Sequence, residues 1–123
     1  MNLNIEAETD GQSPEKVLEA IYFALRYIKQ AGRATCMDKD IFQDADGNSP
    51  STEIVSLTMA IVRRVEQLVG AKAESFDSAT FSEVFEFLSK KARGLNGKMT
   101  DDERKSAEAL AEELAVLPIG YPK

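Results

Sequence analysis

The chain has 123 residues, a mass of 13.5 kDa and a formal net charge of −6 at pH 7. This length suits one domain, and 43% hydrophobic with 29% charged residues is the composition of a folded soluble protein rather than a disordered one. The negative charge argues against binding to nucleic-acid phosphate or to anionic lipid. We therefore expect a single helical domain over residues 1–123, with no nucleic acid and no membrane among its partners.

Residues 1–12 precede the first helical pattern. Their start, MNLNIEAETD, carries acids but no base, and it lacks the basic and apolar regions of a signal peptide. The single cysteine, Cys36, cannot form an intrachain disulfide. These two features lead us to expect a cytoplasmic protein. A lone strand would have no partner to pair with, so we interpret residues 1–12 as an extended arm or tail.

The first helix is predicted over residues 14–31. Ser13 and Pro14 are the usual cap and first residue of a helix, and Gly32 is a typical stop. Lys29 falls among the polar residues of this helix, and Phe23 flanks the apolar stripe. The predicted buried face gathers the apolar residues of one half of the helical wheel, which are Val17, Leu18, Ala20, Ile21, Ala24, Leu25 and Ile28.

The second helix is predicted over residues 50–69, with Ser49 as its cap and Gly70 as its stop. The connection before it is longer than the usual loop of a compact domain, and such loops are usually functional or disordered. Its apolar Met37, Ile41 and Phe42 are expected either to cover the bundle or to face a partner. The predicted buried face of the helix comprises Ile54, Val55, Leu57, Ile61, Val62, Val65, Leu68 and Val69.

The third helix is predicted over residues 79–93. Either Ser78 caps it, or Thr80 does so in a capping box with Glu83, and Gly94 follows its end. Phe87 lies well off the apolar stripe, and a large exposed aromatic marks an interaction surface unless another part of the chain covers it. Met59 and Phe23 are milder cases on the other helices. The stripe itself consists of Phe81, Val84, Phe85 and Leu88.

The fourth helix follows a capping box of Thr100 with Glu103, and residues 118–123 after it form a tail. The short link from the third helix predicts that these two helices are antiparallel neighbours. Asp101, Glu108 and Glu112 form an acidic ridge opposite a narrow, alanine-rich buried stripe. A charged face is usually only solvated, but a ridge of one sign also suits a basic partner by electrostatic steering.

The connection contains the sequence DADGNSPSTE, which resembles the calcium-binding loop of EF-hand proteins. Asp44, Asp46 and Glu53 occupy oxygen-ligand positions of that loop, and Gly47 occupies its turn position. Phe42 stands where the first Asp ligand belongs. The resemblance implies a degenerate calcium site. The alternative is a turn at Asp46 and Gly47 that leads into a capped helix.

The chain contains no histidine, which removes Ser-His catalysis and leaves Cys36 without the usual base. A small buried hydrophobe is the expected role of Cys36. Glu83 and Glu86 have the E-x-x-E spacing that resembles the magnesium motif of all-α nucleotide pyrophosphohydrolases of the MazG type. That family also needs a downstream E-x-x-D on another helix, and none follows Glu86 in this chain. The resemblance implies a magnesium-dependent enzyme, and the alternative is two solvated glutamates.

These features predict an all-α fold, either a four-helix bundle or an irregular four-helix array, with a long connection between the first two helices. We expect a small acidic protein-binding module rather than an enzyme, of the inhibitor, immunity, adaptor or regulatory kind. Its partner is a protein, basic or a second copy, and it needs no cofactor. The alternative is a divalent-metal protein that uses the carboxylates above. The predicted partner-binding residues are Phe42, Phe87, Glu108 and Glu112.

Overall fold

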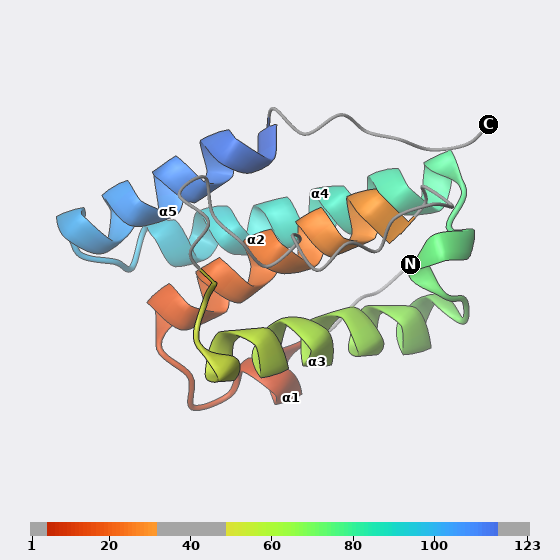
Figure 1. Ribbon diagram of the computed structural model, residues 1–123, viewed down its shortest axis with the longest axis horizontal. Helices are drawn as coiled ribbons and strands as arrows, with labels where there is room; N and C mark the ends of the chain where they lie inside the picture. The colour runs from red at the N-terminus through yellow and green to blue at the C-terminus, as the bar shows by residue number, and fades with distance from the viewer. Residues whose placement is uncertain (1–4, 32–48, 116–123) are drawn as a thin grey trace.

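A computed structural model describes residues 5–31 and 49–115 of the chain. Over these ranges the fold is all-helical, as predicted, and it is built from four long helices (Figure 1). No helix in these ranges is both long and apolar enough to cross a bilayer. The elements in chain order are α1 (Glu6–Thr9), α2 (Pro14–Ala31), α3 (Thr52–Val69), a 3-10 turn η2 (Ala73–Ser75), α4 (Ser78–Asn96) and α5 (Asp101–Ala115).

Helix α2 lies at the centre, and α3, α4 and α5 each pack against it (Figure 1). All the apolar residues predicted for its buried face are buried. Three further residues are buried as well, since Phe23 is 2%, Lys29 only 3% and Ala31 7% exposed. The prediction that Lys29 lies on the polar side of the helix is therefore wrong. A helix covered on several sides buries more of its circumference than the single stripe of a surface helix.

Lys29 is held at the junction of α2 and α4. Its Nζ atom lies 5.1 Å from the centroid of the Phe85 ring, over the face of the aromatic. This arrangement attracts the cation to the negative face of the ring. Burial lowers the pKa of Lys29, because a desolvated ammonium is less stable than the neutral amine. Phe85 is itself only partly buried. Its ring also packs on Phe81, with the two ring centroids 5.6 Å apart.

Helices α2 and α3 run in the same direction. Lys16 Nζ in the first turn of α2 lies 2.8 Å from Glu53 Oε2 in the first turn of α3, and Ala31 and Arg63 share a groove near the other ends. The chain therefore leaves α2 at one end of the molecule and enters α3 at the opposite end (Figure 1). The connection has to traverse the length of α2, about 27 Å at 1.5 Å per residue. This geometry accounts for a long connection without requiring a functional loop.

Helix α4 runs opposite to α2, and α5 runs back in the direction of α2 (Figure 1). The prediction that α4 and α5 are antiparallel is correct, although α5 packs mainly against α2. Helix α3 buries Thr58, which was not predicted, and the Thr58 hydroxyl donates to the Ile54 carbonyl over 2.8 Å. This bond satisfies the polar group in the core. The predicted Val55, Leu68 and Val69 are only partly buried.

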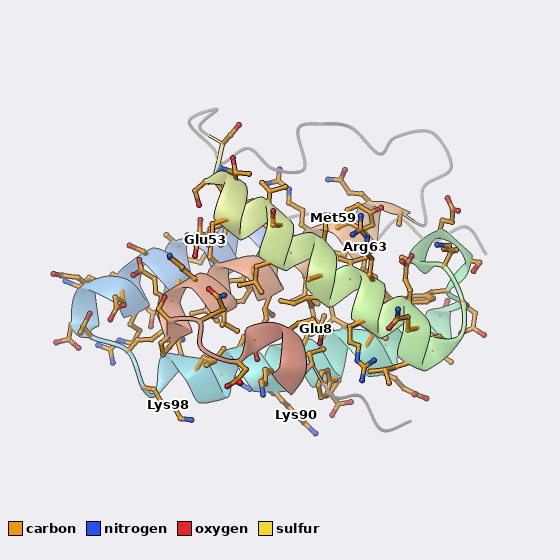
Figure 2. All side chains as sticks on the ribbon, turned by 90° about the horizontal axis from the view of Figure 1, so that it is seen from below. Glu8, Glu53, Met59, Arg63, Lys90 and Lys98 are labelled. Atoms are coloured by element: carbon orange, nitrogen blue, oxygen red, sulfur yellow. The ribbon has the colours of Figure 1, made fainter. Side chains whose placement is uncertain are left out.

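The first described residues do not form the extended arm that we predicted. Ile5 is completely buried in the core, and residues 6–9 form the single helical turn α1 beside α3. The Thr9 hydroxyl donates to the Ile5 carbonyl over 3.3 Å. Glu8 of α1 faces α3, and its Oε2 atom lies 3.9 Å from Arg64 Nε (Figure 2). Burying one Ile side chain contributes roughly 1.5–3 kcal/mol, which offsets the entropy of ordering this turn.

Several predicted helix ends are confirmed. The Ser13 hydroxyl accepts from the Lys16 amide over 3.2 Å at the start of α2. Gly70 ends α3 in the left-handed conformation at φ 81°. The Thr100 box is formed in both directions, since the Glu103 amide donates to Thr100 Oγ1 over 3.3 Å and the Thr100 amide to Glu103 Oε1 over 3.1 Å. These ends depend on residues close in sequence, which explains why the pattern predicted them.

Three predicted ends are wrong. Helix α3 is capped by Ser51, whose hydroxyl accepts from the Ile54 amide over 3.3 Å, and not by Ser49. Helix α4 is capped by Asp77, whose Oδ1 atom accepts from the Thr80 amide over 2.7 Å. Helix α4 also continues past Gly94 to Asn96, where Leu95 packs against the core. The apolar contact of this extra turn outweighs the cost of a helical glycine, about 1 kcal/mol. Gly32 lies outside the described residues.

The two serines before α3 provide a test of its start. Ser51→Ala removes the acceptor for the Ile54 amide, so it should destabilise the protein by about 1 kcal/mol. Ser49→Ala should change the free energy of unfolding by less than about 0.5 kcal/mol. Urea denaturation followed by circular dichroism measures both. A larger loss for Ser49→Ala than for Ser51→Ala would place the cap at Ser49 after all.

Candidate protein-binding surface

Helix α5 presents most of its side chains to solvent. Among residues 101–112, Ala107 is the one buried side chain, at 8% exposure, while Glu103, Leu110 and Ala111 are partly buried. The helix lies along one edge of the molecule, with α2 as its main support (Figure 1). Its outer surface is therefore open to a partner over at least three turns.

Most acids at the start of the long helices have a structural role. Helices α2, α3 and α5 begin at the same end of the molecule (Figure 1). A negative charge in a first turn is stabilised by the partial positive charge of the helix N-terminus. Lys16 neutralises one of these acids, and Arg104 Nη2 lies 3.0 Å from Asp101 Oδ1. The acids explained in this way are Glu15, Glu53, Asp101, Asp102 and Glu103.

Glu108 and Glu112 have no such explanation, and we call them the acidic pair. Both are exposed, and their spacing of four residues places two like charges on neighbouring turns of one face, which is unfavourable. Glu112 also lies near the C-terminal end of α5, where an acid opposes the helix dipole, and the last turn of α5 contains no base. Arg104 Nε is 3.9 Å from Glu108 Oε1, but this guanidinium also binds Asp101. The acidic pair is thus unfavourable for the helix that carries it.

Tyr22 of α2 lies near Glu108 of the acidic pair. Burial raises the pKa of the Tyr22 phenol, the charge of Glu108 raises it further, and Arg93 of α4 opposes this effect. The half-buried ring packs against the core and marks where the surfaces of α2, α4 and α5 meet. Tyrosine is among the side chains that are enriched at protein interfaces.

A second pair of like charges lies between helices. Interaction with Glu103 in the first turn of α5 raises the pKa of Glu15 in the first turn of α2, and burial raises it further, against the opposing effect of Lys16. The Thr100 amide and hydroxyl lower the pKa of Glu103.

A groove of about 730 Å³ opens at the other end of the molecule, where α2 and α3 finish and η2 begins. Met59 and Arg63 line it from the side of α3 that faces away from Glu8 (Figure 2). Glu66 Oε2 accepts from the Ala73 amide over 2.9 Å and so fixes η2 to α3. Acids and bases both line the groove, so its charge selects neither an anionic nor a cationic ligand.

The predicted partner-binding residues have different surroundings. Glu108 and Glu112 share one exposed face of α5, as the ridge pattern indicated. Phe87 is partly buried and packs against the core, which favours cover within the chain over an interface. Phe42 lies outside the described residues. The electrostatic interaction of Glu15 with Glu103 was not predicted, because nothing in the sequence relates two acids so far apart.

The carboxylates proposed as metal ligands are described only in part. Glu53 is paired with Lys16, and Asp44, Asp46 and Cys36 lie outside the described residues. Glu83 and Glu86 are both exposed, and Glu86 Oε1 lies 3.1 Å from Lys90 Nζ. Within residues 5–31 and 49–115, no three side chains of the metal-binding types gather into one site.

No protein-family model, curated protein or solved structure matches this chain. The function therefore has to be inferred from the residues of the chain itself.

Thermal melts with excess calcium or magnesium test the metal alternative. We expect no rise in Tm with either ion, because Lys16 already neutralises Glu53. A bound metal at 100 times its Kd would stabilise the fold by about 2.7 kcal/mol. A rise in Tm that disappears in Glu53→Gln would support the calcium site, and one that disappears in Glu83→Gln would support the magnesium site.

Proposed function

We propose that this protein is a small, cytoplasmic, non-enzymatic module that binds a basic protein surface through α5, in the manner of an inhibitor, immunity, adaptor or regulatory protein. The observation that carries the proposal is the acidic pair, Glu108 and Glu112. These two acids are exposed on one face and are unfavourable for their own helix. Residues that destabilise their own helix without stabilising another part of the fold are expected at functional sites.

The energetics favour a role in recognition and association rate. Each like-charge spacing costs roughly 0.2–0.5 kcal/mol, and a charge against the helix dipole costs roughly 0.3–1 kcal/mol. A cationic partner would recover both amounts on binding. Energies of this size do not create a tight complex alone, but complementary charge accelerates encounter and excludes acidic competitors.

The shape of the α5 surface supports the same proposal. Ala109 is exposed beside the acidic pair, and its small side chain permits close approach of a partner backbone or side chain. Because α5 is a regular helix of 15 residues, the two carboxylates are presented in a fixed geometry rather than on a loop. Such a preorganised surface loses less entropy when it binds.

Charge reversal tests the assignment. The double variant Glu108→Lys with Glu112→Lys should slow association with a purified partner by about tenfold at low ionic strength, and by much less at high ionic strength. The partner is first obtained by affinity capture on the wild-type chain, and the rates are then measured by surface plasmon resonance. Circular dichroism checks that the variant retains its helix content.

The matched control is Glu83→Lys with Glu86→Lys, which makes the same charge change on exposed positions of α4. This control should bind at nearly the wild-type rate. Equal slowing of both double variants would attribute the effect to net charge alone. An unchanged rate for the α5 variant at low ionic strength would disprove the proposed surface.

A further inference from the structure

Helix α4 lies at an edge of the molecule and leaves one face open to solvent. It packs mainly against α2, and Lys90 projects away from the body of the protein, on the same side as Lys98 beyond the helix end (Figure 2). We call the exposed residues between positions 79 and 97 the outer face of α4. They are Ala79, Ser82, Glu83, Glu86, Lys90, Arg93, Gly94 and Gly97.

The outer face of α4 is symmetric about its middle, at the level of the buried Leu88. Counted outward from Leu88, each exposed residue on one side has an exposed counterpart at the same separation on the other side. Helical periodicity explains this symmetry of exposure, but it does not explain the residue types. The counterparts join an acid to a base or one small residue to another. They are Glu86 with Lys90, Glu83 with Arg93, Ser82 with Gly94 and Ala79 with Gly97.

Stabilisation of α4 itself does not account for this separation of charge. The effect of a helix dipole is confined to the first and last turns. The first turn of α4 contains no acid, and Arg93 is the base of its last turn. Glu86 Oε1 lies 3.1 Å from Lys90 Nζ, but both side chains are 66% exposed, and a pair so exposed contributes little. The acidic half and the basic half of the face therefore need another explanation.

Gly94 is a further departure from what the helix alone favours. Glycine destabilises a helix relative to alanine, because it loses more conformational freedom on folding. The backbone of Gly94 is helical rather than left-handed, and nothing lies within 4 Å of the place that a Cβ atom would occupy. Neither the backbone nor the internal packing thus requires glycine. Its absent side chain would instead let another backbone approach closely.

We propose that two copies of this chain pair through the outer faces of α4, with the two helices antiparallel across a two-fold axis at the level of Leu88. In this arrangement the acids of one copy face the bases of the other, and small residues meet at both ends. Each match occurs twice, because the same patch contributes from both copies. The dimer uses a different helix from the proposed function and does not depend on that function.

The dimensions of the outer face define what kind of dimer to expect. Residues 79–97 extend over about 27 Å at 1.5 Å per residue, and a crossing angle of about 20° keeps two such helices in contact along this length. One helix per copy makes a small interface, in the class below about 1,200 Å² that is typical of transient complexes. We therefore expect a weak dimer that is sensitive to salt.

Sedimentation velocity of the full chain tests the dimer. At an ionic strength of about 0.1 M, the Debye length of about 10 Å screens the repulsion between the net charges of two copies but not the close contacts of α4. The sedimentation coefficient should then rise toward that of a dimer as the protein concentration approaches about 1 mM. At about 1 M salt, where the Debye length is about 3 Å, the Kd of the dimer should increase by about threefold or more. A wild type that stays monomeric at the lower salt would overturn the proposal.

Two double variants test the pairing of acids with bases. Glu83→Lys with Glu86→Lys makes the charges of the outer face wholly basic, and Lys90→Glu with Arg93→Glu makes them wholly acidic. Each variant alone should dimerise at least about tenfold more weakly than the wild type, because like charges then face each other. An equimolar mixture of the two should form a heterodimer. Both variants keep a net negative charge, starting from −6, so no overall attraction would explain that heterodimer.

The matched control is Glu108→Lys with Glu112→Lys on α5, which changes the net charge as much as the basic variant does. This control should dimerise like the wild type. Loss of the dimer in the control would overturn the proposal and assign the contact to the acidic pair. A mixture of the two α4 variants that stays monomeric would overturn it as well, provided that circular dichroism shows wild-type helix content in both.

Discussion

Burial of α2 on several sides is the constraint on which the other elements depend. Ten of its 18 residues are buried, and they extend around the helix from Phe23 to Lys29. A single partner helix covers only one stripe, so this width requires α3, α4 and α5 to pack against α2 from different directions. The outer helices therefore need fewer apolar residues than α2. Helix α5 can be largely polar because α2 supplies most of the apolar surface between them.

The shared direction of α2 and α3 follows from the same arrangement and changes how the long connection is understood. A pair of antiparallel helices needs only a short loop, whereas parallel neighbours need a segment that returns along the whole helix. The salt bridge between Lys16 and Glu53 joins the exposed starts of both helices. The segment around Asp44 and Asp46 thus has a topological reason to exist. A metal site is not needed to explain it.

The sequence predicted those features of the fold that arise from neighbouring residues. The bounds of α2 and the box at Thr100 follow from capping chemistry within four residues, and they were predicted correctly. The start of α3 was misplaced because two serines flank Pro50, and only the three-dimensional structure selects Ser51. The burial of Lys29 was not predicted, because a helical-wheel analysis assumes that only one face of the helix is buried.

The features of the candidate surface also differ in whether the sequence could predict them. Glu108 and Glu112 lie one helical turn apart, so their shared face can be deduced from periodicity alone. Glu15 and Glu103 belong to different helices at opposite ends of the sequence, and their electrostatic interaction depends on how α5 packs against α2. No spacing rule links them. An interaction of this kind becomes visible only after the packing of the helices is known.

The central position of α2 also bears on how the protein forms during synthesis. This helix leaves the ribosome before any of the three long helices that cover it. At roughly 5–20 residues per second, its wide apolar surface waits several seconds for them. Contacts between distant parts of the chain form slowly because loop closure precedes them. The nascent chain therefore exposes the apolar surface of α2 before the other long helices can cover it. Chaperone binding or aggregation would compete with folding during this interval.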